Sequence, residues 1–216
     1  MIWNNEILFL HLPKTAGMSM TALLEENLSG PVCISEPGID RRLEKDGLIY
    51  FPGKRHENLF DAESFFTYRN RSVFDFEKVL VVMRNPYDLE VSRYFYLRKG
   101  RDVDRGPAQE IAMSCDFTEY LQRAPFFGQK PPRLDKYFSM NGMIPDNMAI
   151  LRYENLSNDI EFNLEKFLKS KDYKLNHINK SNRKPATDLY DKETEEMCYL
   201  RHRWFFDKGF YSRQKF

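Results

Sequence analysis

The segment from Phe9 to Met20 reads FLHLPKTAGMSM and joins an apolar strand to a helix through a turn containing Lys14 and Gly17. Backbone N–H groups at the start of a helix have no partner within the helix, and the helix dipole adds a partial positive charge there. A lysine supplies a full charge, so this turn can bind a phosphate group. The segment lacks the G-x-x-x-x-G-K-[ST] pattern of nucleoside triphosphatases. An ordinary strand-to-helix turn is the alternative interpretation.

A second segment, residues 78–94, reads KVLVVMRNPYDLEVSRY and again runs from a buried strand into a helix that opens with a proline. Arg84 stands at the carboxyl end of this strand. Ser92 follows it by about two helical turns, so both side chains can face one anion. The structural alternative is an ion pair between Arg84 and a carboxylate such as Asp88 or Glu154.

Strands and helices alternate along the chain. The expected strands cover residues 6–12, 48–51, 78–83 and 148–153, and the expected helices cover residues 18–27, 62–68, 86–97, 108–114, 117–123, 158–170 and 193–206. Residues 28–47 show no clear periodicity and are expected to form a surface excursion. The alternation predicts an α/β fold: a single P-loop-like domain over residues 1–216, with a mainly parallel central sheet flanked by helices. Ligands of such sheets bind outside the carboxyl ends of the strands, where Lys14 and Arg84 are expected.

Composition excludes several classes of function. The chain of 216 residues is 42% hydrophobic and 15% aromatic, which is enough for one substantial core. Its formal charge of +1 provides no general basic field, so nucleic acid is not expected as a partner. Three widely spaced cysteines favour free thiols in a reducing compartment. Without a signal peptide or an apolar run long enough to span a membrane, the expected location is cytoplasmic.

Both segments resemble motifs of sulfotransferases that use 3′-phosphoadenosine 5′-phosphosulfate (PAPS), in particular the carbohydrate-type, family 2-like branch. The first motif of that branch reads much like HIPKTAGTS, and the second reads RNPxxxxxSxY. A third segment, NKSNRKP at residues 179–185, resembles the family's closing loop over the nucleotide. The resemblance covers residues 5–27, 77–97 and 148–211. It implies a sulfotransferase that moves a sulfuryl group to an acceptor hydroxyl and releases adenosine 3′,5′-bisphosphate (PAP).

The resemblance also assigns roles to residues. The first loop would bind the 5′-phosphosulfate, Arg84 and Ser92 the ribose 3′-phosphate, and Arg183 and Lys184 the nucleotide phosphates from the closing loop. The residues of the first loop that would bind the donor are Lys14, Thr15, Ala16, Gly17, Met18, Ser19 and Met20. Met18 departs from the family, which commonly has a small polar residue there, so one possible hydroxyl contact is lost. The middle of the chain matches only loosely, and the acceptor is expected to bind there.

Sulfuryl transfer needs positioning and charge stabilisation more than covalent help. Lys14 is therefore the main catalytic candidate, because it would stabilise charge that grows on the departing 5′-phosphate. His56 is the candidate general base, since an imidazole suits base catalysis near neutral pH and it follows the carboxyl end of a strand. An exposed loop histidine is the alternative for His56. His11 is expected to be a buried neighbour of the first loop. No metal requirement is expected, because the chain has no compact set of metal ligands.

The acceptor is expected to be a hydroxyl on a glycan or glycoconjugate, on resemblance alone. Lys54 and Arg55 could meet an anionic acceptor, although adjacent basic residues are more often solvated. Two alternatives of other classes stay open. One is an ATP-dependent small-molecule kinase, which predicts magnesium dependence. The other is a noncatalytic nucleotide- or glycan-binding module on the same scaffold, which would tolerate loss of Lys14 and His56.

Overall fold

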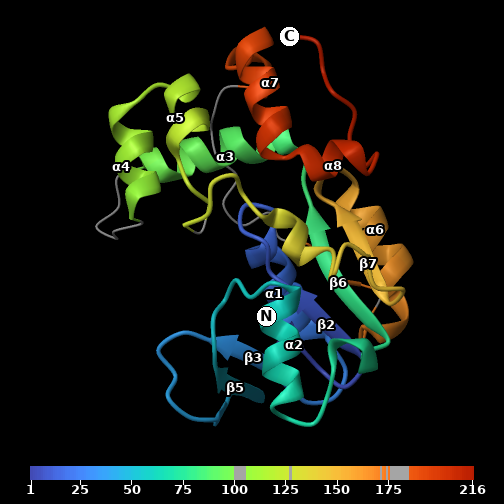
Figure 1. Cartoon of the computed structure of the whole chain (residues 1–216). Helices are drawn as coiled ribbons and strands as arrows, with labels where there is room; N and C mark the ends of the chain where they lie inside the picture. The colour runs from blue at the N-terminus through green and yellow to red at the C-terminus, as the bar shows by residue number, and fades with distance from the viewer. Residues whose placement is uncertain (100–105, 127, 171, 174, 176–184) are drawn as a thin grey trace. The chain divides into compact units, whose positions relative to one another are not determined.

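The computed structural model describes residues 1–99, 106–126, 128–170, 172–173, 175 and 185–216 (Figure 1). The chain divides into two compact units, of which the first comprises residues 1–83 and 136–179 and the second residues 84–135 and 180–216. Each unit has its own apolar core. The single sulfotransferase domain over residues 1–216 stays a prediction.

The first unit contains, within the described residues, a seven-stranded sheet of order β4-β5-β3-β1-β2-β6-β7. Its strands are β1 (Ile2–Trp3), β2 (Ile7–Leu10), β3 (Val32–Glu36), β4 (Leu43–Lys45), β5 (Leu48–Pro52), β6 (Lys78–Met83) and β7 (Met148–Arg152). The longer pairings, β2 with β6, β6 with β7 and β3 with β5, are parallel. Strand β1 runs antiparallel to β2 and β3, and β4 runs antiparallel to β5. The predicted α/β fold with a mainly parallel central sheet is confirmed.

Helices cover the sheet of the first unit because its central strands are apolar on both faces. Every residue of β2 is buried, as expected for a strand covered on both sides. Helices α1 (Gly17–Asn27) and α6 (Leu156–Leu164) join the core cluster that contains Phe9 and Val82. Helix α2 (Leu59–Thr67) contributes Phe66, whose ring packs edge-on against Trp3 at 5.4 Å. Trp3 is therefore a core residue.

Four local expectations were wrong. The helix expected over residues 193–206 is interrupted at His202, where one helix ends and another begins. Residues 28–47 contain strands β3 and β4, which lack a clear alternating pattern because β3 pairs inside the sheet and β4 is fully exposed. Helix α2 begins earlier than expected, because Asn58 rather than Asp61 caps it; Asp61 is the reciprocal partner in the capping box. Helix α6 ends at Leu164, and a short 3₁₀ helix, η4 (Glu165–Phe167), follows it.

The described residues of the second unit form helices α3 to α5, α7 and α8. These are α3 (Pro86–Arg98), α4 (Pro107–Ser114), α5 (Phe117–Arg123), α7 (Lys192–Arg201) and α8 (Arg203–Asp207). The remaining short 3₁₀ helices among the described residues are η1 (Val73–Asp75), η2 (Leu134–Tyr137), η3 (Tyr153–Asn155) and η5 (Ala186–Asp188). Aromatic rings fill the core of this unit, and Tyr87 and Tyr190 pack edge-on at 5.1 Å.

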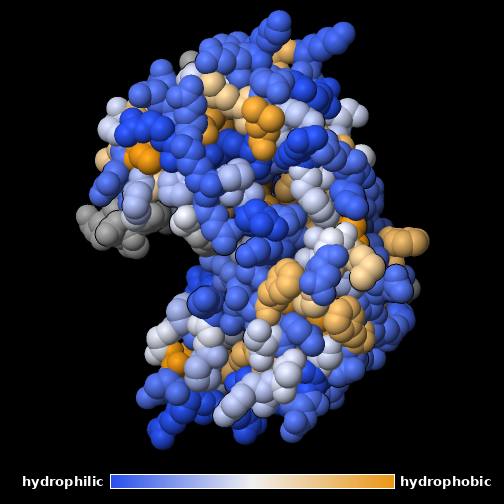
Figure 2. Space-filling view, in the orientation of Figure 1, coloured by the Kyte–Doolittle hydropathy of each residue, from blue (hydrophilic) through white to orange (hydrophobic). Residues whose placement is uncertain are grey.

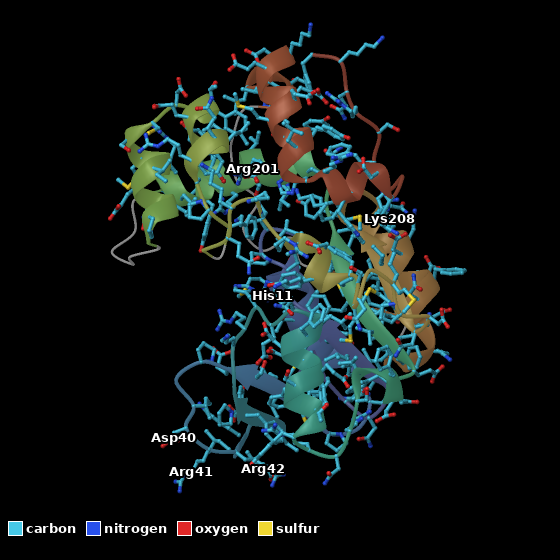
Figure 3. All side chains as sticks on the ribbon, viewed as in Figure 1. His11, Asp40, Arg41, Arg42, Arg201 and Lys208 are labelled. Atoms are coloured by element: carbon cyan, nitrogen blue, oxygen red, sulfur yellow. The ribbon has the colours of Figure 1, made fainter. Side chains whose placement is uncertain are left out.

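A buried carboxylate links three helices of the second unit. Glu90 on α3 accepts hydrogen bonds from Arg201 Nε at 3.1 Å, His202 Nε2 at 2.7 Å and the Tyr120 hydroxyl at 2.8 Å. Arg201 lies at the end of α7 (Figure 3). Burial acts to raise the pKa of Glu90, but the positive charge of Arg201 and the bond from His202 bring it well below its usual range. The carboxylate is therefore held in its charged form.

The face drawn in Figure 2 is largely hydrophilic, as expected for a chain with 30% charged residues. Among the described residues, no helix is long and apolar enough to cross a membrane. The three cysteines, Cys33, Cys115 and Cys198, form no disulfide.

Candidate functional site

The loop between β2 and α1, residues 11–16, has the backbone of an anion-binding turn. Lys14 and Ala16 adopt left-handed conformations, with φ of 66° and 61°, whereas Thr15 between them and Gly17 after them do not. Successive residues of alternating handedness turn their N–H groups toward one concavity, which binds anions. The arrangement costs about 1–2 kcal/mol for each left-handed residue other than glycine. A strained backbone of this kind marks the loop as a candidate binding site.

The start of α1 adds to this concavity. Ala16 makes no side-chain capping bond, and the first turn of α1 contains no acidic residue. The N–H of Met20 donates to the carbonyl of Ala16 at 3.0 Å, as expected for the first regular bond of an α-helix that begins at Gly17. An anion at this end would receive backbone donors and the favourable end of the helix dipole.

The predicted loop residues differ in what their side chains can do. Lys14 is half-buried, and Met18 is 45% exposed. The Thr15 side chain is fully buried and donates its hydroxyl to the carbonyl of Leu12 at 2.8 Å, which holds the turn together. Met20 is also fully buried and belongs to the core cluster, so its side chain anchors α1. The N–H of Met20 donates to the carbonyl of Ala16, so Met20 holds α1 in place and offers an anion neither a side-chain contact nor an unused N–H group.

His11 lies against the start of α1, at the end of β2 (Figure 3). A Cβ built onto Gly17 would lie 1.8 Å from His11 Cδ2, so only glycine fits at this position. His11 is 6% exposed. Burial lowers the pKa of His11 to about 3, with His56 and nearby positive charges acting in the same direction. His11 is therefore neutral at physiological pH, in agreement with the expectation of a buried neighbour of the loop.

His56 also belongs to this cluster. Its Nδ1 lies 3.0 Å from the backbone oxygen of His11, and the two rings meet edge-on with centroids 4.5 Å apart. A carbonyl oxygen only accepts hydrogen bonds, so Nδ1 carries the proton and Nε2 carries the lone pair. Burial lowers the pKa of His56 below its ordinary value, while the bond to the His11 carbonyl acts in the opposite direction. A neutral imidazole with a basic Nε2 is the form that a general base requires.

Hydrogen bonds from other segments fix the loop that carries His56. The Tyr137 hydroxyl donates to the backbone oxygen of His56 at 2.9 Å. Glu57 accepts from the Ser35 hydroxyl at 2.8 Å and from the backbone N–H of Lys54 at 3.2 Å. A Cβ on Gly53 would approach Ser35 Cβ to 2.8 Å, so this close packing also needs glycine. The sequence pattern did not reveal Tyr137 or Ser35, because neither lies near His56 in the chain.

The second motif forms its own cluster, in the second unit. Asn85 caps α3 by accepting from the N–H of Tyr87 at 3.0 Å. Arg84 is 7% exposed and donates from Nε to Asp88 Oδ2 at 2.7 Å and from Nη1 to Ser92 Oγ at 3.3 Å. Arg84 and Ser92 therefore lie together as predicted, and the ion pair with Asp88 that was the structural alternative is present as well.

Other expectations concern residues outside these clusters. Arg183, Lys184 and His177 lie outside the described residues. Arg55 forms an ion pair with Glu36, and its side chain is 46% exposed, in line with the solvated interpretation. Among the described residues, no group of three or more histidine, cysteine, aspartate or glutamate side chains is placed to hold a metal ion.

The chain is similar in part to a solved structure of another protein. No family model and no curated protein matches the sequence. A crystal structure of mouse sulfotransferase SULT7A1 complexed with PAP aligns with the chain at a TM-score of 0.44 and 16% sequence identity. The alignment covers 76% of this chain and 58% of the mouse protein, so the chain spans less than two thirds of that protein's length.

Proposed function

We propose that this protein is a sulfotransferase that moves a sulfuryl group from PAPS to an acceptor hydroxyl, with a carbohydrate as the acceptor. One observation carries the proposal: the anion-binding turn and the neutral base His56 belong to one hydrogen-bonded cluster, joined through the carbonyl of His11. The turn offers backbone donors and a lysine for the 5′-phosphosulfate. The resemblance of both motifs to PAPS-dependent enzymes favours sulfuryl over phosphoryl transfer.

In this proposal Lys14 and the backbone N–H groups at the start of α1 bind the 5′-phosphosulfate end of the donor. The donor supplies an activated sulfuryl group. The acceptor oxygen bonds to sulfur as the bond from sulfur to the bridging oxygen breaks, and the acceptor proton passes to His56 Nε2. Lys14 stabilises the negative charge that grows on the departing phosphate, an interaction that strengthens toward the transition state.

Arg84 and Ser92 are proposed to bind the ribose 3′-phosphate. Their contact at 3.3 Å places a guanidinium and a hydroxyl on one side of α3, and both groups can donate to phosphate oxygens. Asp88 already accepts from Arg84, so a phosphate bound there would meet a nearby carboxylate. Arg183 and Lys184 are proposed to complete the nucleotide site on resemblance alone. The resemblance to the carbohydrate-type branch is also what supports a glycan or glycoconjugate as the acceptor.

Thermal unfolding in the presence of PAP, of AMP and of ATP with magnesium tests the donor site. At about 100 times the Kd, a ligand stabilises the folded state by about 2.7 kcal/mol, which corresponds to about 5–11 °C for a chain of this size. We expect a shift with PAP alone. The shift should shrink in Lys14→Ala and in Arg84→Ala, because each removes a charge that binds one end of the nucleotide.

Two matched variants control for loss of charge. Lys45→Ala removes an exposed lysine on β4, and Arg203→Ala removes an exposed arginine that pairs with Asp207 at the same i,i+4 spacing as Arg84 and Asp88. Both should keep the wild-type shift. A magnesium-dependent shift with ATP alone would replace the proposal with a kinase. A shift with PAP but no transfer from labelled PAPS to any of a panel of glycans would favour the noncatalytic module.

A further inference from the structure

His11 occupies the place where the β2–α1 loop meets His56. Its ring lies so close to Gly17 that an added Cβ would be 1.8 Å from Cδ2 and 1.9 Å from Nε2. The ring also meets the His56 ring edge-on at 4.5 Å, and the His11 backbone oxygen lies 3.0 Å from His56 Nδ1. One buried residue thus contacts both the backbone of the anion-binding turn and the candidate base.

We infer that His11 is a positioning residue: its carbonyl fixes the Nδ1–H tautomer of His56, and its ring, wedged between Gly17 and His56, keeps that carbonyl in place. The inference deepens the proposed function and rests on it for the role of His56 as base. Its consequence is that Nε2 of His56 is the atom that takes the acceptor proton. The carbonyl also accepts from Nδ1 after His56 is protonated, so it stabilises the imidazolium in the way that a carboxylate does in a catalytic triad.

The surroundings of His56 are consistent with a neutral base. Groups that titrate or carry charge near it come from several segments: the His11 ring, the amino group of Met1, Arg55, Glu57 and Tyr137. The amino group and Arg55 disfavour protonation of His56, whereas the His11 carbonyl favours it. The neutral His11 ring adds no charge of its own at physiological pH, so its effect on His56 is one of geometry.

Nitrogen-15 NMR of protein labelled at histidine reads the tautomer directly, with His56→Asn used to assign the signals. We expect His56 in the wild type to show a protonated Nδ1 and an unprotonated Nε2. His202 provides an internal control, because its Nε2 donates to Glu90 at 2.7 Å and its buried Nδ1 has no hydrogen-bond partner among the residues that the structure describes. His56 and His202 should therefore show opposite tautomers in one spectrum.

Variants test the role of the ring. In His11→Ala we expect a mixture of His56 tautomers. The kcat for sulfuryl transfer should fall by about tenfold, which is less than the full contribution of a general base, because part of the His56 population keeps the active tautomer. The KM for PAPS should stay within about twofold, because the backbone donors of the turn remain. His11→Phe, which keeps a planar ring, should recover most of the kcat. The His202 signals should not change in either variant.

A wild-type spectrum with His56 protonated at Nε2 would overturn the inference without any variant. So would a folded His11→Ala protein with the wild-type tautomer ratio and kcat. These outcomes are separate from failure of the proposed function, because the tautomer is measured without donor or turnover. If PAP gives no thermal shift, the donor assignment fails whatever the tautomer of His56.

Discussion

Replacing Gly17 with alanine should destabilise the first unit, although the same change inside a helix usually stabilises it by up to about 1 kcal/mol. The backbone of Gly17 is not left-handed, so its φ does not require glycine. The obstacle is the His11 ring, which an added Cβ would approach to 1.8 Å where ordinary contacts begin at 3.4 Å. The ring is buried and has His56 beside it, so relief requires movement of the backbone.

The expected change in the free energy of unfolding combines two opposing effects, the collision with the His11 ring and the preference of helices for alanine over glycine. Overpacking a closely packed site costs about 1–3 kcal/mol. Because the added Cβ would lie 1.8 Å from the His11 ring, far inside ordinary contact distance, we expect a cost near ~3 kcal/mol. Subtracting the helix preference of about 1 kcal/mol leaves a loss of about 2 kcal/mol in the free energy of unfolding. The collision disappears in the His11→Ala background. There the same substitution should be neutral or stabilising, so the coupling energy between the two positions should be about 2–3 kcal/mol.

Urea denaturation measures the free energy of unfolding of each protein in this double-mutant cycle. Trp3 lies in the first unit and Trp204 in the second, so a Trp204→Phe background makes fluorescence report on the first unit alone. His11→Ala, Gly17→Ala and the double variant are compared in that background. If Gly17→Ala leaves the free energy of unfolding unchanged or raises it while His11 is present, the ring does not occupy this place. The structural account of the glycine in the first motif then fails.

Two further predictions follow from the site. Because the pKa of His11 is about 3 when folded and about 6.5 in the unfolded chain, the unfolded state takes up its proton first as pH falls. The wild type should lose about 1.4 kcal/mol per pH unit relative to His11→Asn between about pH 6.5 and pH 3, with no such loss above that range, in urea titrations across pH. Asp88→Asn keeps an oxygen that accepts from Arg84 but removes a charge beside the proposed 3′-phosphate. It should tighten PAP binding by about fivefold, or about 1 kcal/mol, in calorimetry, and weaker binding would mean that the carboxylate is needed to orient Arg84.

The two motif-bearing elements could be predicted closely because their signals are local. Strand β6 begins at Lys78 and ends at Met83 as expected, since its apolar run stops at an arginine and a proline opens the next helix. The turn before α1 was predicted from a lysine and a glycine. Its left-handed residues, Lys14 and Ala16, could not be predicted, because neither residue type favours that conformation without the surrounding packing.

Contacts between distant parts of the chain account for most of what the sequence did not reveal. The role of Gly17 in binding the phosphate stays a prediction, but the sequence did not reveal that a Cβ there would collide with the His11 ring. His56 was expected at a strand end, but its bond to the His11 carbonyl joins residues 45 positions apart. Tyr137 contacts His56 across 81 positions. A pattern of neighbouring residues does not encode such pairs, because the residues meet only when distant segments pack together.

The strain in the β2–α1 loop gives the site its proposed selectivity for anions. Two left-handed residues cost about 1–2 kcal/mol each, and the loop keeps them because its surroundings are fixed. Thr15 bonds the turn to Leu12, and Met20 anchors α1 in the core. His11 closes the remaining space at Gly17. The donors are therefore arranged before any ligand arrives, so binding does not have to order the loop. Because the same His11 also holds His56, its loss should misplace the base, while Thr15 and Met20 keep the donors of the turn in place.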